Sequence, residues 1–258
     1  MSDAWIRAIV ALPFGLGVGS FMTVAVYRLP RGESVIRPRS KCPACGAEIG
    51  ARDNFPVLSW LLLRGRCRRC GERISIEYPL LELTTAALVV LAAIRYPNPW
   101  QAGLVGGLLA LMPGIALIDL RHRIIPNRLT YPSLLLFSLV IVLARVIGGV
   151  GDPARAGIGL LLYGGILFVV AVVSRGMGMG DVKLAALIGL VLGSLGLRFV
   201  GVAAGAAIAF GGLGGVVALA MGKGRKSAIP FGPYLAAGAV VGGIWGEQIA
   251  SWYIGSFL

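Results

Sequence analysis

Two aspartates stand out because each lies at one end of an apolar stretch long enough to enter a membrane. Asp119 closes one such stretch, and Asp181 follows the glycine-rich run 176–180 and opens another. Ionisable residues at membrane depth are costly and usually functional. Two neighbouring carboxyl groups cannot easily both ionise, so one can deprotonate a water while the other polarises a carbonyl. This pair of residue types could therefore hydrolyse an amide bond without a metal or a covalent nucleophile.

Several residues near these aspartates could assist such chemistry. Glycines lack a Cβ and permit close backbone approach, which suits a loop that admits an extended peptide. The predicted substrate loop consists of Gly176, Gly178, Gly180 and Lys183. Glu82 begins another apolar stretch, and His122 lies three residues past Asp119, so each could support the pair; His122 is also explained as an ordinary residue of a basic loop. Because it is the single histidine, a multi-histidine metal site is excluded.

All four cysteines occur in one polar segment as two CxxC pairs, each followed by glycine and separated by 21 residues. They are Cys42, Cys45, Cys67 and Cys70. This spacing is typical of a zinc ribbon, in which four thiolates complete a tetrahedral shell and leave no position open for catalysis. The alternative is two disulfides, which are rare in the cytoplasm. We therefore expect a structural Zn²⁺, provided that this loop is cytoplasmic.

The composition indicates a membrane protein with several spans. The chain is 57% hydrophobic and only 14% charged, whereas soluble domains carry about 25% charged residues. Eight apolar stretches could form membrane helices: 8–27, 79–94, 101–118, 129–147, 157–174, 184–197, 199–222 and 229–252. Only Arg198 separates the sixth from the seventh, so seven helices is the alternative. Gly201/Gly205 and Gly211/Gly215 have the GxxxG spacing of packed membrane helices.

The basic residues are confined to alternate loops. Nineteen of the 24 lysines and arginines lie in four segments: 28–78, 119–128, 175–183 and 223–228. Cytoplasmic loops are enriched in basic residues, so these segments and both aspartates are predicted at the cytoplasmic face. The net charge of +13 is explained in this way without a nucleic-acid partner. The chain divides into a first transmembrane helix, a cysteine loop and a transmembrane core: 1–28, 29–78 and 79–258.

These motifs, in this order, resemble those of the type IV prepilin leader peptidases, within the GxGD group of membrane aspartyl proteases. The likeness runs from about residue 15 to 240. The matching segments are Gly19–Phe21 with Tyr27–Pro30, the CxxC pairs around Asp53–Pro56 and Ser59–Leu61, Tyr78–Pro79 with Glu82–Thr84, Asp119–Pro126, Gly176–Asp181 with Lys183, and Ile229–Pro233. One departure is Thr23, which stands where the family usually has asparagine.

The resemblance implies an eight-helix protein of the bacterial inner membrane that cleaves prepilin or pseudopilin precursors at the cytoplasmic face. Asp119 and Asp181 would be its catalytic pair. It also implies methylation of the new amino terminus by S-adenosylmethionine, for which the sequence identifies no cofactor-binding residues. The alternative is a transporter that relays ions or protons through the two aspartates; it is disfavoured because both acids are predicted at one face and no inverted repeat is visible. The oligomeric state is left open.

Overall fold

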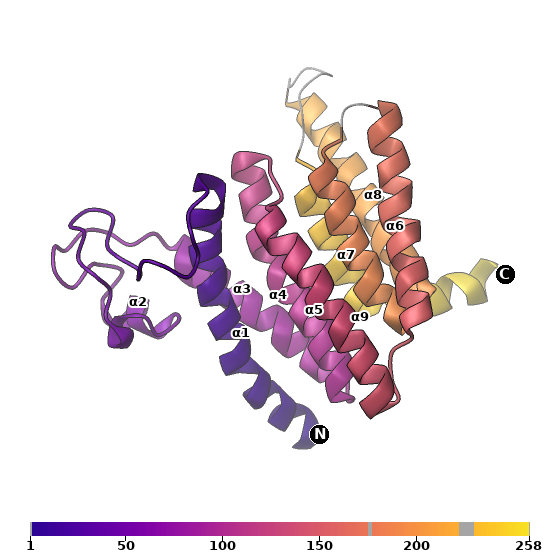
Figure 1. The fold of residues 1–258 in the computed structure, drawn as a ribbon, viewed down its shortest axis with the longest axis horizontal. Coiled ribbons are helices and arrows are strands. Elements are labelled where there is room, and N and C mark those ends of the chain that lie inside the picture. Colours follow the sequence, from indigo (N-terminus) through magenta and orange to yellow (C-terminus); the bar gives the residue numbers. More distant parts are fainter. Residues whose placement is uncertain (1, 175–176, 222–229, 258) are drawn as a thin grey trace.

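The computed structural model describes residues 2–174, 177–221 and 230–257, and this part of the chain is almost wholly helical (Figure 1). The predicted all-α fold is confirmed. Eight long helices occur in the described ranges: α1 Ser2–Arg28, α3 Glu77–Arg95, α4 Pro99–His122, α5 Asn127–Gly148, α6 Pro153–Ser174, α7 Met179–Leu195, α8 Leu197–Ala220 and α9 Gly232–Phe257.

The boundary between α7 and α8 lies at Gly196, two residues before the Arg198 that the sequence indicated. Gly196 has φ 151° and ψ 145°, a conformation that is open almost only to glycine. Its N–H group still donates to the Leu192 carbonyl at 3.2 Å, which ends α7. The chain then reverses directly into α8, so the sixth and seventh apolar stretches are separate helices.

Six of the described helices are long and apolar enough to cross a membrane: α1, α3, α4, α5, α6 and α8. The helix α7 has only 17 residues, fewer than the roughly 20 that a full span takes. Most of its residues are buried within the bundle by neighbouring helices. The chain is therefore a multi-pass membrane protein in which α7 is shielded by the helices around it.

Small residues bring some helices together, but not at every position that the sequence indicated. The helices α6 and α7 approach so closely that a Cβ on Gly159 would lie 2.3 Å from the Gly189 carbonyl oxygen. At Gly201 and Gly205, in contrast, an added Cβ would meet nothing within 4 Å, so among the described residues no other helix packs against this pair. A GxxxG spacing identifies a small-residue face without telling whether another helix covers it.

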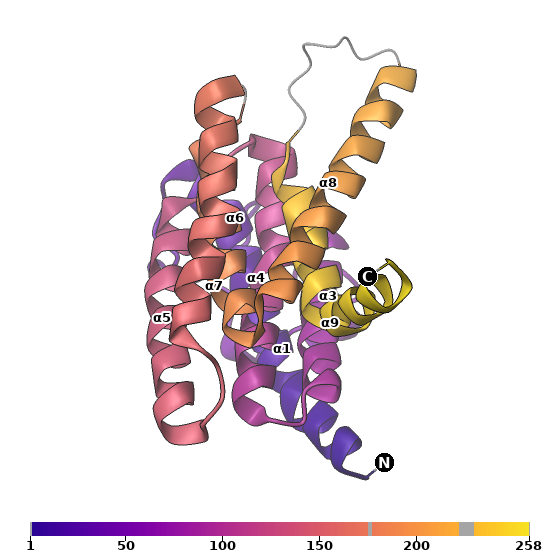
Figure 2. The same ribbon diagram turned by 90° about the vertical axis from the view of Figure 1, so that its right-hand side faces the viewer.

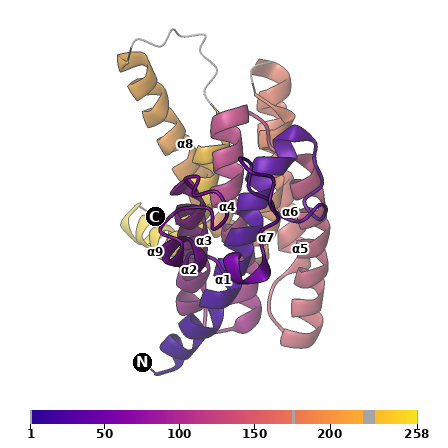
Figure 3. The same ribbon diagram turned by 90° about the vertical axis from the view of Figure 1, so that its left-hand side faces the viewer.

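The functional segments lie at one end of the bundle (Figures 1 and 2). The helices α1, α4, α6 and α8 end there, and α3, α5, α7 and α9 begin there. The cysteine loop leaves α1 at this end and folds back beside α1 and α3, as Figure 3 shows. It contains the short elements η1 Leu29–Arg31, η2 Ala51–Asp53 and α2 Leu58–Leu62.

Candidate active site

Asp119 lies in the last turn of α4, where its side chain is buried at 5% exposure. Its Oδ2 atom accepts a hydrogen bond of 2.9 Å from the backbone N–H of Gly232, at the start of α9. The helix ends at His122 and is capped by Arg123, which has a left-handed backbone (φ 54°) and donates its N–H group to the Asp119 carbonyl at 2.8 Å. The carboxyl group is thus fixed between the end of one helix and the beginning of another.

Asp181 occupies the first turn of α7, and its N–H group donates to the Gly178 carbonyl at 3.1 Å. Gly178 is the N-cap of this helix, with an extended backbone. The Asp119 carboxyl is close enough to act electrostatically on that of Asp181. The structure therefore brings together, at one end of the bundle, two acids that are 62 positions apart in sequence.

The beginning of α7 is positioned by the turn between α4 and α5. A Cβ on Gly180 would lie 3.0 Å from the Cβ of Ile125, so glycine permits the helix to pack against this turn. Lys183 donates to Asn127 Oδ1 at 2.8 Å and lies 5.0 Å from the centre of the Tyr131 ring. The lysine predicted in the substrate loop thus ties α7 to α5. Gly176, predicted in the same loop, lies outside the described residues.

Glu82 and His122, the two possible supporting residues, have neighbours other than the aspartates. Glu82 is buried in α3, and its Oε2 atom accepts a hydrogen bond of 2.7 Å from the Val57 N–H in the cysteine loop. His122 lines a cavity of about 230 Å³ between α1, α3 and α4, together with Tyr27 and Tyr78. Both residues therefore connect to the cysteine-loop side of the bundle.

The backbone amide of Gly232 is the member of the site that sequence reasoning missed. The sequence points to the segment Ile229–Pro233 only through the family resemblance. A glycine followed by proline does indicate a helix start, but no local pattern indicates that its N–H group would meet Asp119, 113 residues earlier. Asn127 was missed for the same reason, since its contact with Lys183 joins two different helices.

The four cysteines come together as two similar turns. Their sulfurs all lie within 4.8 Å of one another, and all four thiols are free. In each turn the glycine after the second cysteine has a positive φ, and its N–H group donates to the first cysteine's carbonyl at 2.9 Å: Gly46 to Cys42 and Gly71 to Cys67. The predicted four-cysteine cluster is thus present and could hold a metal ion.

The distances between the sulfurs suit zinc. A tetrahedral site with Zn–S bonds of about 2.3 Å separates its sulfurs by about 3.8 Å, and the Sγ atoms of Cys42 and Cys70 are 3.9 Å apart. Arg68, between the cysteines of the second pair, donates to both carboxylate oxygens of Asp53, with the shortest contact at 2.7 Å. This guanidinium lowers the pKa of the Asp53 carboxyl. The ion pair joins η2 to the second cysteine turn.

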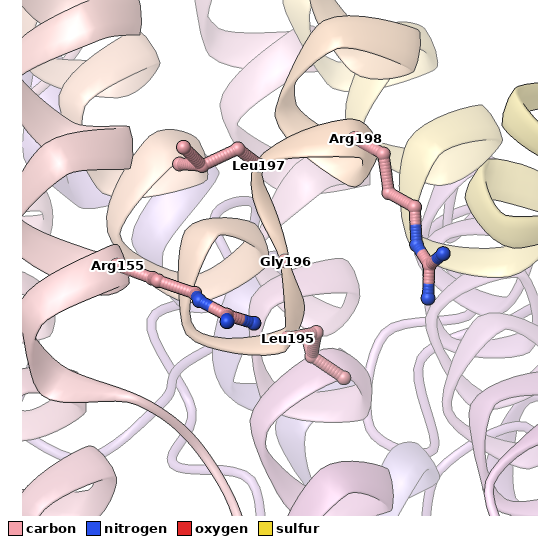
Figure 4. Close-up of a pocket in the computed structure, with 5 residues that line it drawn as sticks. All are labelled: Arg155, Leu195, Gly196, Leu197 and Arg198. Carbon is pink, nitrogen blue, oxygen red and sulfur yellow. The ribbon is translucent and has the colours of Figure 1, made fainter.

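A second cavity, of about 350 Å³, lies at the opposite end of the bundle beside the α7–α8 turn. Figure 4 shows Arg155 and Arg198 on either side of this turn. Each arginine is paired with an acid, Arg155 with Asp152 at 3.2 Å and Arg198 with Glu247 at 2.6 Å. Because its charges are neutralised and the two aspartates lie at the other end, this cavity does not belong to the candidate active site.

Fold and site together define a multi-pass helical membrane protein with a pair of carboxyl groups at one end and a four-cysteine loop beside it. Residues 14–96 match the bacterial peptidase A24 N-terminal domain, and residues 104–219 match the type IV leader peptidase family. The chain therefore belongs to the type IV leader peptidase family.

Two curated relatives support this assignment over nearly the whole chain. The prepilin leader peptidase/N-methyltransferase of Bacillus subtilis (strain 168) is 36% identical over 245 residues, which cover 93% of this chain and 95% of the relative. The protein of the same name from Aeromonas hydrophila is 35% identical over 289 residues, covering 98% of this chain and 96% of the relative. No solved structure matches the chain.

Proposed function

We propose that this protein is a membrane aspartyl endopeptidase that removes the leader peptide from prepilin or pseudopilin precursors and then methylates the new amino terminus. Membership of the leader peptidase family supports the reaction class. The observation that carries the mechanism is the position of Asp119 in the last turn of α4 and of Asp181 in the first turn of α7, close enough for one carboxyl to act electrostatically on the other. The same placement favours a peptidase over the ion-relay alternative, which needs ionisable groups along a path across the membrane.

The two carboxyl groups divide the chemistry of peptide hydrolysis between them. The ionised carboxylate takes a proton from a water molecule, which attacks the scissile carbonyl carbon. The protonated carboxyl donates a hydrogen bond to the carbonyl oxygen and stabilises the developing negative charge. The Gly232 N–H group holds Asp119 in place for this work, because a backbone amide can only donate to the carboxyl oxygen.

We place this chemistry at the cytoplasmic face of a bacterial inner membrane. The loops that join helices at the aspartate end carry 19 of the 24 basic residues, as the positive-inside rule requires of cytoplasmic loops. A precursor with a short basic leader and an apolar helix would present its junction at this depth. The division into a first helix (1–28), a metal-binding loop (29–78) and a peptidase core (79–258) belongs to the same proposal.

S-adenosylmethionine is the methyl donor that the relatives' activity implies, but the cavity of about 230 Å³ between α1, α3 and α4 does not suit it. A sulfonium cation is recognised by acids and aromatic faces. Among the groups around this cavity, Glu77 is already bonded to Arg121, and Arg31 lies 4.0 Å from the centre of the Tyr27 ring. The acid and the aromatic ring that could bind a sulfonium cation are therefore already occupied by Arg121 and Arg31. We assign no residue to the methyl-transfer step.

We propose that the cysteine loop holds one structural Zn²⁺ through Cys42, Cys45, Cys67 and Cys70. Metal binding would supply much of the folding free energy of a loop that has little apolar core. Purified protein is expected to contain about one zinc per chain by elemental analysis. Replacing Cys42 and Cys67 by serine removes two ligands and is expected to abolish binding.

The matched control for the cysteine replacements is Ala44→Ser, which adds a hydroxyl group to the same turn but keeps all four thiols. It should retain its zinc. A metal-free but folded protein purified under reducing conditions, or a disulfide in the cell, would contradict the zinc assignment.

The proposed function is tested with the full-length protein in lipid bilayers and a precursor truncated to its leader and first helix. Orientation in the bilayer lowers the entropic part of the barrier, so the mature globular domain should be dispensable. Mass spectrometry is expected to find a new amino terminus directly after the leader's last glycine. A precursor with a bulky residue in place of that glycine is the control and should stay uncut; no cleavage of either precursor would refute the proposal.

A further inference from the structure

The short helix α2 exposes an apolar face on an otherwise polar loop. Three of its five residues are leucines with exposed fractions of 53%, 58% and 73%: Leu58, Leu61 and Leu62. Phe55, just before the helix, is 61% exposed. The spacing i, i+3, i+4 puts the three leucines on one side of the helix. We call Phe55 and these three residues the leucine face.

The interior of the loop fixes the direction in which this face points. Ser59 is buried, accepts the Phe55 N–H at 3.0 Å and donates to the Arg52 carbonyl at 3.1 Å. Trp60 packs on Gly65, where a Cβ would lie 2.9 Å from the ring, and its indole N–H donates to the Ile74 carbonyl at 3.1 Å. The polar and aromatic side of α2 is thus turned inward, so the leucines must face away from the loop.

The loop is fastened to the side of a membrane helix. The Val57 N–H donates to Glu82 Oε2 at 2.7 Å, and Glu82 lies five residues inside α3, which begins at Glu77. At 1.5 Å per residue this is a depth of about 7.5 Å along the helix. Val57 has φ 60°, which is costly for a β-branched residue, so a firm contact with Glu82 is needed to hold this conformation.

The surfaces of α1 and α3 beside the leucine face are apolar, and a membrane must cover them. Phe21 of α1 and Leu80 and Leu83 of α3 are 44%, 51% and 48% exposed, on helices that are long and apolar enough to span a bilayer. Figures 1 and 3 both show α2 beside these two helices instead of beyond the end of the bundle. The apolar surface of the loop therefore lies next to that of the membrane helices.

We propose that the leucine face is an interfacial anchor, which enters the boundary between lipid headgroups and acyl chains in the leaflet around α1 and α3. Interfacial helices bury their apolar side about 5–10 Å into this region, which agrees with the depth of Glu82. Arg52 and Arg64, exposed at the two ends of this segment, would meet the phosphates of anionic phospholipids. The anchor would hold the four-cysteine loop against the membrane beside the aspartate end.

The anchor is tested by photo-cross-linking of the full-length protein in nanodiscs of phosphatidylethanolamine and phosphatidylglycerol. p-Benzoylphenylalanine replaces Leu62 in one variant and Glu48, an exposed residue of the first cysteine turn, in the control. Mass spectrometry is expected to find phospholipid adducts at position 62 at least tenfold more often than at position 48. Equal yields, or adducts at position 62 mainly with a second copy of the chain or with a precursor, would overturn the proposal.

A second variant separates the anchor from the stability of the loop. Leu61→Gln with Leu62→Gln removes the apolar face but leaves Trp60, Ser59 and the four cysteines in place. Hydrogen exchange of the α2 amides in nanodiscs should become at least tenfold faster, with unchanged metal content. Unchanged exchange would contradict the anchor. Neither experiment measures precursor cleavage, so the anchor and the peptidase proposal can fail independently.

Discussion

Replacing either Asp119 or Asp181 by asparagine is expected to lower the rate of precursor cleavage by about a thousandfold or more. Each carboxyl has its own task, and loss of a general acid or base typically costs 10²–10⁴ in rate. Asparagine keeps an oxygen that can accept the Gly232 N–H, so Asp119→Asn changes the ionisation of the group more than its position. The measurement is the single-turnover rate of leader removal in bilayers, followed by mass spectrometry.

Asp152→Asn is the matched control for these two replacements. Asp152 accepts the N–H groups of Ala154 and Arg155 at the start of α6, at the end of the bundle opposite the aspartate pair. Asparagine also caps helices well, so this variant should cleave at the unchanged rate. Near-normal turnover by Asp119→Asn or by Asp181→Asn would remove that residue from the proposed mechanism.

Much of the architecture could be predicted because it depends on local signals. Apolar stretches bounded by charges correspond to helices, and each of the eight expected stretches overlaps an observed helix in the described residues. The CxxC spacing likewise predicts the cysteine cluster, because each pair forms its own turn. Alternation of loops from one side to the other then places Asp119 and Asp181 at the same end without any knowledge of packing.

The contacts that join distant helices could not be predicted in this way. The sequence places Lys183 with the glycines of a predicted substrate loop, but it does not reveal that the lysine nitrogen donates to Asn127 on α5. The position of Glu82 at a helix start groups it with the aspartates, yet its partner is the Val57 amide. In each case the partner is fixed by how distant segments rotate and pack, which the sequence of neither segment reveals.

The two aspartates also differ in their surroundings, and this difference was not visible in the sequence. Asp119 is buried beneath the first turn of α9, whereas Asp181 is partly exposed in the first turn of α7. Asp181 thus has more of its surface exposed, while Asp119 is held by the hydrogen bond from the Gly232 N–H group. The position of Asp119 depends on α9, a helix that contributes no acid to the pair.

Gly232→Ala is therefore expected to lower cleavage about a hundredfold, although it changes no ionisable group. A Cβ at this position would lie 2.7 Å from Asp119 Oδ2 and 3.0 Å from its Cβ and Cγ atoms. Either the Asp119 carboxyl or the start of α9 must move, and a displacement of about 1 Å in a catalytic group can cost 10²-fold in rate. The loss should appear in the single-turnover rate of leader removal, with precursor affinity little changed.

The matched control is Gly255→Ala in the same helix, where a Cβ meets nothing within 4 Å. Both variants carry the same chemical change in α9, so a difference between them reports the contact with Asp119. Zinc content should stay close to that of the parent protein in both variants, because neither glycine touches the cysteine loop. If Gly232→Ala cleaves as fast as Gly255→Ala, the Gly232 amide does not position Asp119.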